Sequence, residues 1–146
     1  MGKIKVDGVL VTPLKKITNT KGDILHALKK SDSGFLGFGE AYFSVVNKGE
    51  IKGWNRHKQM TLNLIVPIGS VKFVIIDDAI ADNNIIEIEL SLQNYQRLTV
   101  PPGLWVGFQN LSKQKSMILN IANLEHDPAE KETINLDEIN YKWSNA

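Results

Sequence analysis

The ten residues IKGWNRHKQM, at positions 51–60, bring together residue types that are scarce in this chain. They contain Trp54, Arg56, which is one of two arginines, and His57, which is one of three histidines. An imidazole takes up and releases protons near neutral pH, because its ordinary pKa is about 6.5. The segment therefore indicates a site of proton transfer, with a metal site and a charged strand end as the alternatives.

In an extended conformation, residues 55–63 would divide their side chains between two faces, because successive residues of a strand point to opposite sides. One face would carry Asn55, His57, Gln59, Thr61 and Asn63, and the other would carry Arg56, Lys58, Met60, Leu62 and Leu64. The neutral polar row suits the inside of a small barrel that holds one ligand. A strand with an ordinary solvated face is the simpler interpretation, and a bulge at Lys58-Gln59 would break the alternation.

The spacing of possible metal ligands argues against a bound transition metal. The segment reads Asn55-x-His57 where a metal site on a strand commonly reads His-x-His, and no acidic residue lies between Glu50 and Asp77. His26 and His126 are distant in the sequence, and a single imidazole does not hold zinc or iron tightly. We therefore expect no metal and no cofactor.

Covalent catalysis has no support in the sequence either. The chain has no cysteine, which excludes disulfides, thiolate metal sites and thiol nucleophiles, and it has no Gly-x-Ser-x-Gly stretch. The segment GFLGFGE (34–40) has the spacing of neither common phosphate-binding loop. Proton transfer is the chemistry that remains for a site built around His57.

Two further clusters lie downstream. PPGLWVGF (101–108) predicts a tight turn followed by Trp105 and Phe108. A tryptophan at this place would either wall a pocket or pack in the core. LEHDP (124–128) has the composition of a surface turn.

Short β-strands must position these clusters, because strand patterns dominate the chain. VKFVII (71–76) is a nearly continuous apolar run, whereas IIEIELS (85–91) alternates apolar and acidic residues. Further β-rich runs are AYFSVV (41–46), TLNLIV (61–66), RLTV (97–100) and MILNIA (117–122). Their regular spacing predicts an all-β sandwich or barrel, and Pro128 would open a single helical turn in a polar C-terminal segment.

The composition fits a single domain over residues 1–146. Hydrophobic residues make up 42% of the chain and charged residues 23%, which is typical of a folded soluble protein. The formal net charge of +1 gives no electrostatic basis for binding nucleic acid or an anionic membrane. No apolar stretch reaches the length of a bilayer span, and MGKIKVDGVL lacks the apolar core of a signal peptide, so we expect a cytoplasmic protein.

Taken together, these clusters resemble the nucleotide-sugar cupins, which are the dTDP-4-dehydrorhamnose 3,5-epimerase family and the related 3,4-ketoisomerases of dTDP-4-keto-6-deoxyhexoses. The resemblance runs from about Gly22 to Trp143. It rests on four blocks in order: GEIKGWN (49–55), VPIGSVKFVIIDD (66–78), RLTVPPGLWVGFQNLS (97–112) and DEINYKW (137–143). It implies a double-stranded β-helix, the cupin jelly roll, and a homodimer.

The first block departs from the family's pattern in a way that bears on catalysis. Metal-binding cupins carry histidines where this chain has Asn55, His57 and Val106, so two of three ligands are missing. The epimerases place their base where Asn55 stands, and an amide cannot take a proton from carbon. The ketoisomerases carry His-x-His-Lys, of which His57-Lys58 remains.

The resemblance implies roles for three candidate catalytic residues. A C4 ketone acidifies the hydrogens at C3 and C5, so a base on one sugar face can remove a proton and form an enolate. We expect His57 to be that base, His126 to be the acid on the opposite sugar face and Asp137 to be the partner of the base.

Eight residues are expected to bind a nucleotide-linked 4-keto sugar. Among them Lys52 would contact phosphate, and Arg56, Lys58 or Asn63 would stabilise the enolate. The full set is Tyr42, Lys52, Asn55, Arg56, Lys58, Asn63, Arg97 and Trp105.

The leading interpretation is a metal-free nucleotide-sugar isomerase, similar to dTDP-4-dehydrorhamnose 3,5-epimerase, in the synthesis of surface polysaccharide such as lipopolysaccharide. A 3,4-ketoisomerase of the same substrates is the second, because His57-Lys58 remains. A catalytically silent sugar-binding cupin is the third, because Asn55 replaces the base. The fold by itself does not choose between them.

Overall fold

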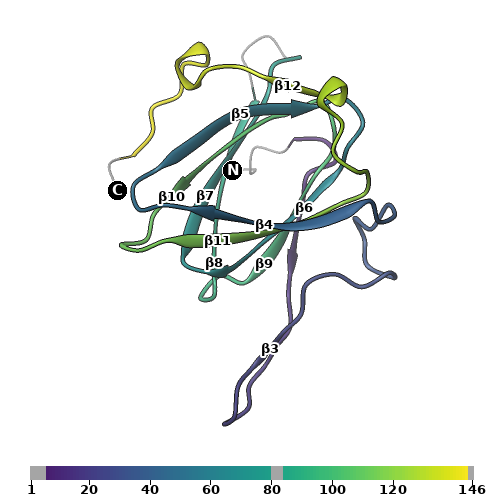
Figure 1. Cartoon of the computed structure of the whole chain (residues 1–146), viewed down its shortest axis with the longest axis vertical. Helices are drawn as coiled ribbons and strands as arrows, with labels where there is room; N and C mark the ends of the chain where they lie inside the picture. The colour runs from purple at the N-terminus through teal and green to yellow at the C-terminus, as the bar shows by residue number, and fades with distance from the viewer. Residues whose placement is uncertain (1–5, 80–83, 145–146) are drawn as a thin grey trace, which may run out of the picture.

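The computed structural model describes residues 6–79 and 84–144, in which the regular structure is almost entirely β (Figure 1). The first antiparallel sheet has the order β1 (Leu10–Pro13), β9 (Gln96–Val100), β6 (Leu62–Ile68), β11 (Ser116–Ala122) and β4 (Glu40–Val46). The second has the order β12 (Lys131–Thr133), β5 (Ile51–His57), β10 (Trp105–Asn110), β7 (Ser70–Asp77) and β8 (Asn84–Ser91). The two sheets face each other, and the all-β prediction is confirmed.

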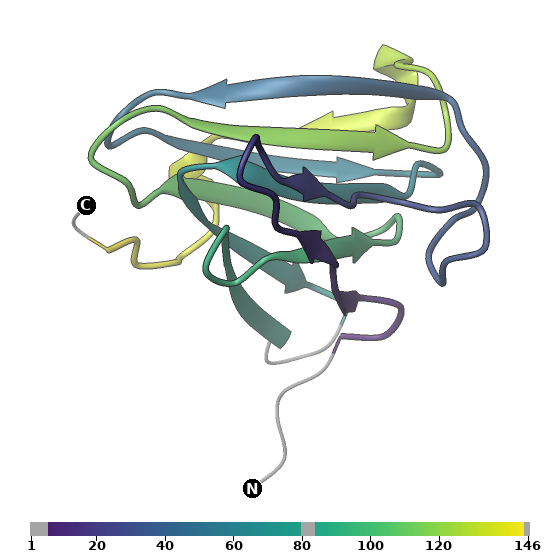
Figure 2. The same cartoon turned by 90° about the horizontal axis from the view of Figure 1, so that it is seen from below.

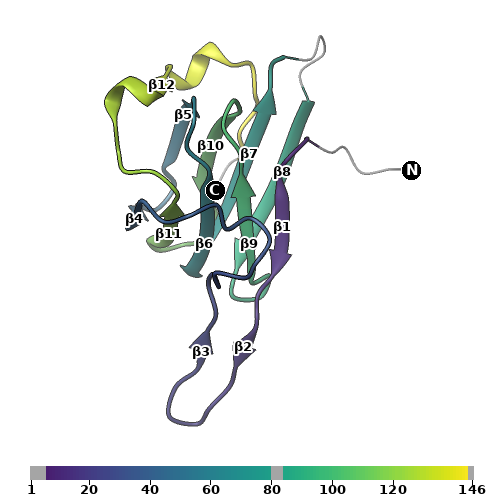
Figure 3. The same ribbon diagram turned by 90° about the vertical axis from the view of Figure 1, so that its right-hand side faces the viewer.

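Two smaller features complete the described chain. The hairpin of β2 (Lys16–Ile17) and β3 (Ile24–Leu25) projects from the body of the molecule (Figure 3). Two 3-10 turns, η1 (Pro128–Glu130) and η2 (Leu136–Glu138), flank β12, and Pro128 opens the first of them as expected. Within the described residues, no helix is long and apolar enough to cross a membrane.

The environment of β7 explains its nearly continuous apolar run. Val71, Phe73 and Ile75 face the core between the two sheets. Val74 and Ile76 belong to a second buried cluster, which means that both faces of the strand are covered. On the neighbouring β8, Glu87 and Glu89 are exposed, whereas Ile86, Ile88 and Leu90 pack into the core between the sheets, and this produces the alternation.

The C-terminal segment covers the second sheet on its outer face. Trp54 of β5 is fully buried there, and its indole N–H donates to the carbonyl of Leu136 at 3.0 Å. The Trp54 and Trp143 rings lie 5.3 Å apart, and the Tyr141 and Trp143 rings lie 4.7 Å apart. The segment is yellow in Figure 2 and continues from η2 to residue 144. These aromatic contacts fix the back of the strand whose front carries Asn55 and His57.

The predicted alternation over residues 55–63 is wrong beyond His57. The chain leaves the second sheet at His57 and enters the first sheet at Leu62, so the two strands do not share one face pattern. After the crossing, Met60, Leu62 and Leu64 line the same cavity as Asn55 and His57. Asn63 is buried away from this cavity, because the crossing between the sheets reverses which alternate residues face the cavity.

Candidate active site

A cavity of about 430 Å³ lies between the two sheets. Apolar side chains supply much of its wall and a limited number of polar groups converge on it, as in sites that bind one small organic molecule. Its lining is Glu40, Tyr42, Ser44, Lys52, Asn55, His57, Met60, Leu62, Leu64, Val106, Phe108, Ile118, Asn120, His126 and Lys131.

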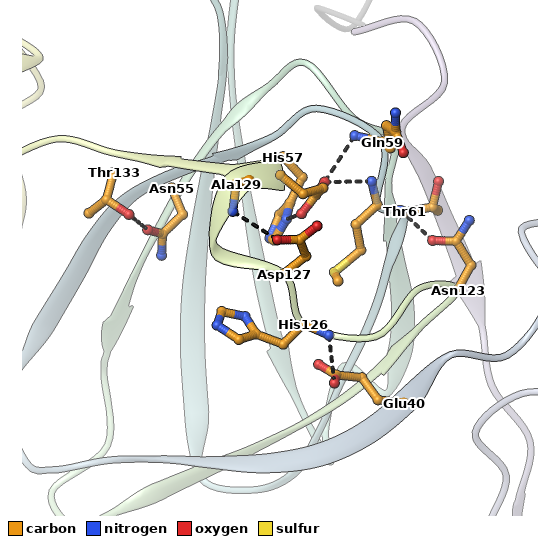
Figure 4. A network of polar contacts seen from close by, with 12 residues as sticks. Glu40, Asn55, His57, Gln59, Thr61, Asn123, His126, Asp127, Ala129 and Thr133 are labelled. Carbon is orange, nitrogen blue, oxygen red and sulfur yellow. Dashed lines mark hydrogen bonds and ion pairs between the residues drawn. The ribbon is translucent and has the colours of Figure 1, made fainter.

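His57 stands at the end of β5 and is held by a carboxylate (Figure 4). Its Nδ1 lies 2.7 Å from Oε1 of Glu130, which is the last residue of η1. The second oxygen, Oε2, accepts from the backbone N–H groups of Gln59 at 2.9 Å and Met60 at 2.8 Å. The Glu130 side chain is only 8% exposed and the His57 side chain 14%. The pair is therefore partly shielded from water and geometrically fixed.

The hydrogen bonds to Glu130 determine which nitrogen of His57 is basic. Burial raises the pKa of Glu130, but the donors His57, Gln59 and Met60 together outweigh burial and hold the pKa at about 2. An ionised carboxylate only accepts hydrogen bonds, so Nδ1 of His57 must donate to it. In the neutral ring, Nε2 then carries the lone pair. An imidazole held in this tautomer can accept a proton at Nε2.

Asn55 lies two residues before His57 on the same strand and lines the same cavity. Its side-chain oxygen accepts a hydrogen bond from the hydroxyl of Thr133 at 2.8 Å. Thr133 is the register partner of Asn55 across the β12–β5 pair. A register shift between β5 and β10 also lets Lys52 and Asn55, three residues apart, line one cavity.

The first sheet supplies a hydroxyl on the other side of the cavity. Tyr42 of β4 accepts a hydrogen bond at its oxygen from the Asn120 amide of β11, at 3.0 Å. The phenol hydrogen is therefore available to a ligand. Asn120 is 2% exposed, and its Oδ1 is buried with no partner among the described residues.

His126 reaches the cavity from the loop between β11 and η1. Its backbone N–H donates to the Glu40 carboxylate at 2.9 Å (Figure 4). The following residue, Asp127, caps η1 by accepting from the Ala129 N–H at 3.0 Å. The loop that carries His126 is thus anchored on both sides.

Residues 7–137 match the model of the WxcM-like, C-terminal (FdtA) family. The chain belongs to this family. The match covers nearly all of both sheets and includes Asn55, His57, His126 and Glu130. No curated protein matches the chain.

Solved structures show what this member of the WxcM-like family resembles. A dTDP sugar isomerase from Desulfovibrio desulfuricans G20 has 29% identity and a TM-score of 0.89, over 97% of this chain and 94% of that one. A dTDP-6-deoxy-D-glucose-3,5-epimerase from Legionella pneumophila Philadelphia 1, in complex with dTDP-4-keto-L-rhamnose, has 18% identity and a TM-score of 0.82, over 97% and 81%. QdtA, a sugar 3,4-ketoisomerase from Thermoanaerobacterium thermosaccharolyticum in complex with TDP, has 24% identity and a TM-score of 0.74, over 92% and 93%. These likenesses confirm the cupin jelly roll, and together with the family match they confirm the suspected family.

The structure brings five of the eleven predicted site residues of this WxcM-like chain to one cavity. They are Tyr42, Lys52, Asn55, His57 and His126. The other six lie outside that lining.

Arg56 and Trp105 lie on the opposite face of the second sheet from His57. The Arg56 guanidinium bonds to Asp78 at 3.2 Å and to Glu132 at 2.9 Å, and it stacks 4.4 Å from the centre of the Trp105 ring. The Trp105 indole donates to Asp78 at 2.9 Å. Of the two readings of Trp105, packing in a buried cluster is the one that the structure supports.

Arg97 and Asn63 form part of a buried polar cluster beside the first sheet. Arg97 is fully buried and donates to the Ala27 carbonyl at 2.9 Å, the Ser33 carbonyl at 3.0 Å and the Asp32 carboxylate at 3.2 Å. Its Nε also donates to Asn63 Oδ1 at 3.2 Å. These contacts hold the loop before β4 and leave neither side chain directed at the cavity.

Asp137 is not the partner of His57. It lies in η2 and lines a separate surface depression with Tyr141 and Trp143. Glu130 holds the imidazole instead. Lys58 is exposed and does not line the cavity, although its backbone N–H donates to the Glu130 carbonyl at 2.9 Å.

Sequence reasoning missed six polar residues of the site. They are Glu40, Ser44, Asn120, Glu130, Lys131 and Thr133. Glu130 is 73 residues from His57 and belongs to no motif. Only the pairing of the three-residue strand β12 with β5 brings this polar segment to the cavity. A strand this short in DPAEKET gives no readable alternation.

No group of three or more His, Cys, Asp or Glu is arranged to hold a metal ion in the described part of the chain. The absence of a catalytic metal stays a prediction, which elemental analysis of the protein can check.

Proposed function

We propose that the protein is a 3,4-ketoisomerase of a dTDP-linked 4-keto-6-deoxyhexose, with His57 as the base. The observation that carries this proposal is the His57–Glu130 pair, in which His57 lines the cavity, Nδ1 is engaged by Glu130, and Nε2 has no hydrogen-bond partner among the described residues. A ketoisomerase needs a base mainly on one sugar face, and this is the one carboxylate-backed imidazole among the described residues. Membership of the WxcM-like family and the likeness to dTDP-sugar isomerases and epimerases support the substrate class.

The proton balance of this reaction closes without another reactant. His57 Nε2 takes the proton from C3, and the C–H electron pair forms a C3=C4 double bond while O4 becomes an oxyanion. The hydroxyl proton of O3 moves to O4, giving the isomeric enediolate with its charge on O3. The imidazolium then returns its proton to C4, and O3 becomes the new carbonyl. Glu130 keeps the imidazolium oriented and neutralises its charge while the intermediate exists.

Two other parts of the cavity suit the same substrate. The Tyr42 hydroxyl would contact the sugar oxygens that exchange the proton, since Asn120 already occupies its acceptor side. Lys52 and Lys131 line the cavity and would neutralise the diphosphate. The product would supply an activated sugar for surface polysaccharide, such as lipopolysaccharide, in the cytoplasm.

A 3,5-epimerase is the second candidate, and His126 favours it. Inversion requires an acid on the sugar face opposite the base, and His126 lines the same cavity from a different element. In that reaction the ketone stays at C4, and protons are exchanged at C3 or C5 with inversion.

NMR of the product made in D2O from dTDP-4-keto-6-deoxyglucose distinguishes these candidates. A ketoisomerase gives a 3-keto product with deuterium at C4. An epimerase keeps the C4 ketone and gives inverted, deuterated C3 or C5. A chain that binds nucleotide sugars but leaves all of them unchanged would be the silent binding protein, and both proposals would be wrong.

A further inference from the structure

Asn55 occupies a position where a base would stand in the epimerases, yet the structure gives it a defined environment of its own. It faces the cavity from β5, on the same strand face as His57. The register pairs Thr133 with Asn55 and Lys131 with His57, so β12 lies directly beside both residues. Residues i and i+2 of a strand are roughly 7 Å apart. The two side chains can therefore reach neighbouring atoms of one sugar ring.

The hydrogen bond from Thr133 determines the direction of the Asn55 amide. The Thr133 hydroxyl donates to Oδ1 at 2.8 Å, which occupies the acceptor end of the amide. The donor end, Nδ2, has two N–H groups and no hydrogen-bond partner among residues 6–79 and 84–144. An unengaged amide donor in a ligand cavity indicates a ligand acceptor.

We propose that the Asn55 amide donates to the substrate oxygen that becomes negatively charged when His57 removes the neighbouring C–H proton, and that Thr133 is its positioning residue. This inference rests on the proposed function. The developing charge on a ketone oxygen is stabilised most by donors that are already oriented before the reaction. An amide supplies such a donor without competing for the proton, because it is not basic at neutral pH. Replacement of a base by asparagine thus leaves one base and one oxyanion donor on the same strand.

The opposite amide orientation is the alternative to exclude. Nδ2 would then donate to the Thr133 oxygen, and Oδ1 would face the cavity as an acceptor for a sugar hydroxyl. Such an acceptor would repel an oxyanion. NMR of the free, isotope-labelled protein separates the two orientations without any substrate.

The NMR comparison uses Thr133→Val, which keeps the shape but loses the hydroxyl, and Thr133→Ser, which keeps the hydroxyl. We expect Thr133→Val to shift the Asn55 Cγ carbonyl resonance and to leave its side-chain NH2 protons nearly unchanged. Thr133→Ser should keep the parent resonance. A shift of one NH2 proton with an unchanged carbonyl would overturn the inference.

Kinetics test the role in the reaction. Loss of one oxyanion donor lowers kcat by about 10²–10³-fold, so Asn55→Ala should show this loss with little change in KM. Asn55→Asp, which has the same shape but a negative acceptor, should lose at least as much. Thr133→Val should lower kcat by about 10-fold, and Thr133→Ser should restore it. A change confined to KM, or an active Asn55→Asp variant, would overturn the oxyanion role.

The failure of the proposed function has a different signature. A parent protein that isomerises no nucleotide-linked 4-keto sugar would refute the function and the oxyanion role together. A parent that isomerises the sugar while Asn55→Ala keeps its kcat would refute the oxyanion role alone.

Discussion

Replacement of Glu130 by glutamine should weaken the protein in a way that depends on pH. The pKa of Glu130 is about 2 in the folded chain, against an ordinary value of 4.5. Because the folded-state pKa is depressed, the carboxylate contributes stability above pH 4.5, and this contribution is lost as the pH falls towards 2. The difference between the two pKa values corresponds to about 3 kcal/mol in the free energy of unfolding.

Glutamine keeps the shape of the side chain but removes the charge from its three hydrogen bonds. We expect Glu130→Gln to lower the free energy of unfolding by about 2–3 kcal/mol at pH 7. The parent should lose about 2 kcal/mol of the Glu130 contribution between pH 7 and pH 3, whereas the variant should not. The difference between the two proteins should therefore shrink as the pH falls.

Urea unfolding, followed by tryptophan fluorescence at pH 7, 5, 4 and 3, measures this difference. Glu125→Gln is the matched control, because Glu125 is exposed in the same loop region and should change stability by less than about 0.5 kcal/mol. If Glu130→Gln lowered the free energy of unfolding equally at every pH, or by no more than the control does, the assignment of the Glu130 pKa would be contradicted.

Further predictions concern catalysis, assembly and metal. His57→Gln should reduce deuterium exchange into a 4-keto sugar by at least about 10²-fold, while His26→Gln, a histidine outside the cavity, should leave it unchanged. His126→Ala should keep deuterium exchange. If the protein inverts the configuration of its substrate, this variant should lose the inversion only, and NMR of the product reports exchange and inversion together. The chain should form a homodimer, because the edge strand β4 exposes Phe43 (63%) and Val45 (44%). Light scattering should give a mass of twice 16.3 kDa, and Phe43→Glu should shift this mass towards that of the monomer. Elemental analysis should find no stoichiometric zinc, iron or manganese, and a chelator should not alter the rate.

The fold was predictable because its strands carry strong local patterns. VKFVII lies in β7, which is covered on both faces and therefore has a continuous apolar run. IIEIELS lies in β8, which leaves Glu87 and Glu89 exposed and therefore alternates. The resemblance also located Asn55, His57 and Lys52, which lie close together on one strand. Local patterning suffices for parts of a site that one strand carries.

The rest of the site depends on pairings between distant segments, which no local pattern records. Asp137 and Glu130 are both acidic residues of a polar C-terminal segment, and only the β12–β5 register decides which of them meets His57. Because the chain changes sheets after His57, Asn63 does not share a face with Asn55 and His57 as the alternation predicted. Arg97, which was expected to bind the substrate, donates its hydrogen bonds to loop carbonyls instead.

The pairing of His57 with a carboxylate 73 residues later in the chain has a consequence for folding during synthesis. Residues 51–60 are synthesised long before Glu130 and Thr133. The growing chain therefore contains His57 without the Glu130 carboxylate and Asn55 without the Thr133 hydroxyl. The completed base can appear only after β12 has been added beside β5. Formation of the His57–Glu130 pair should therefore lag behind formation of the other strands, and a chain arrested before residue 130 would carry most of the walls of the cavity without the carboxylate that holds His57.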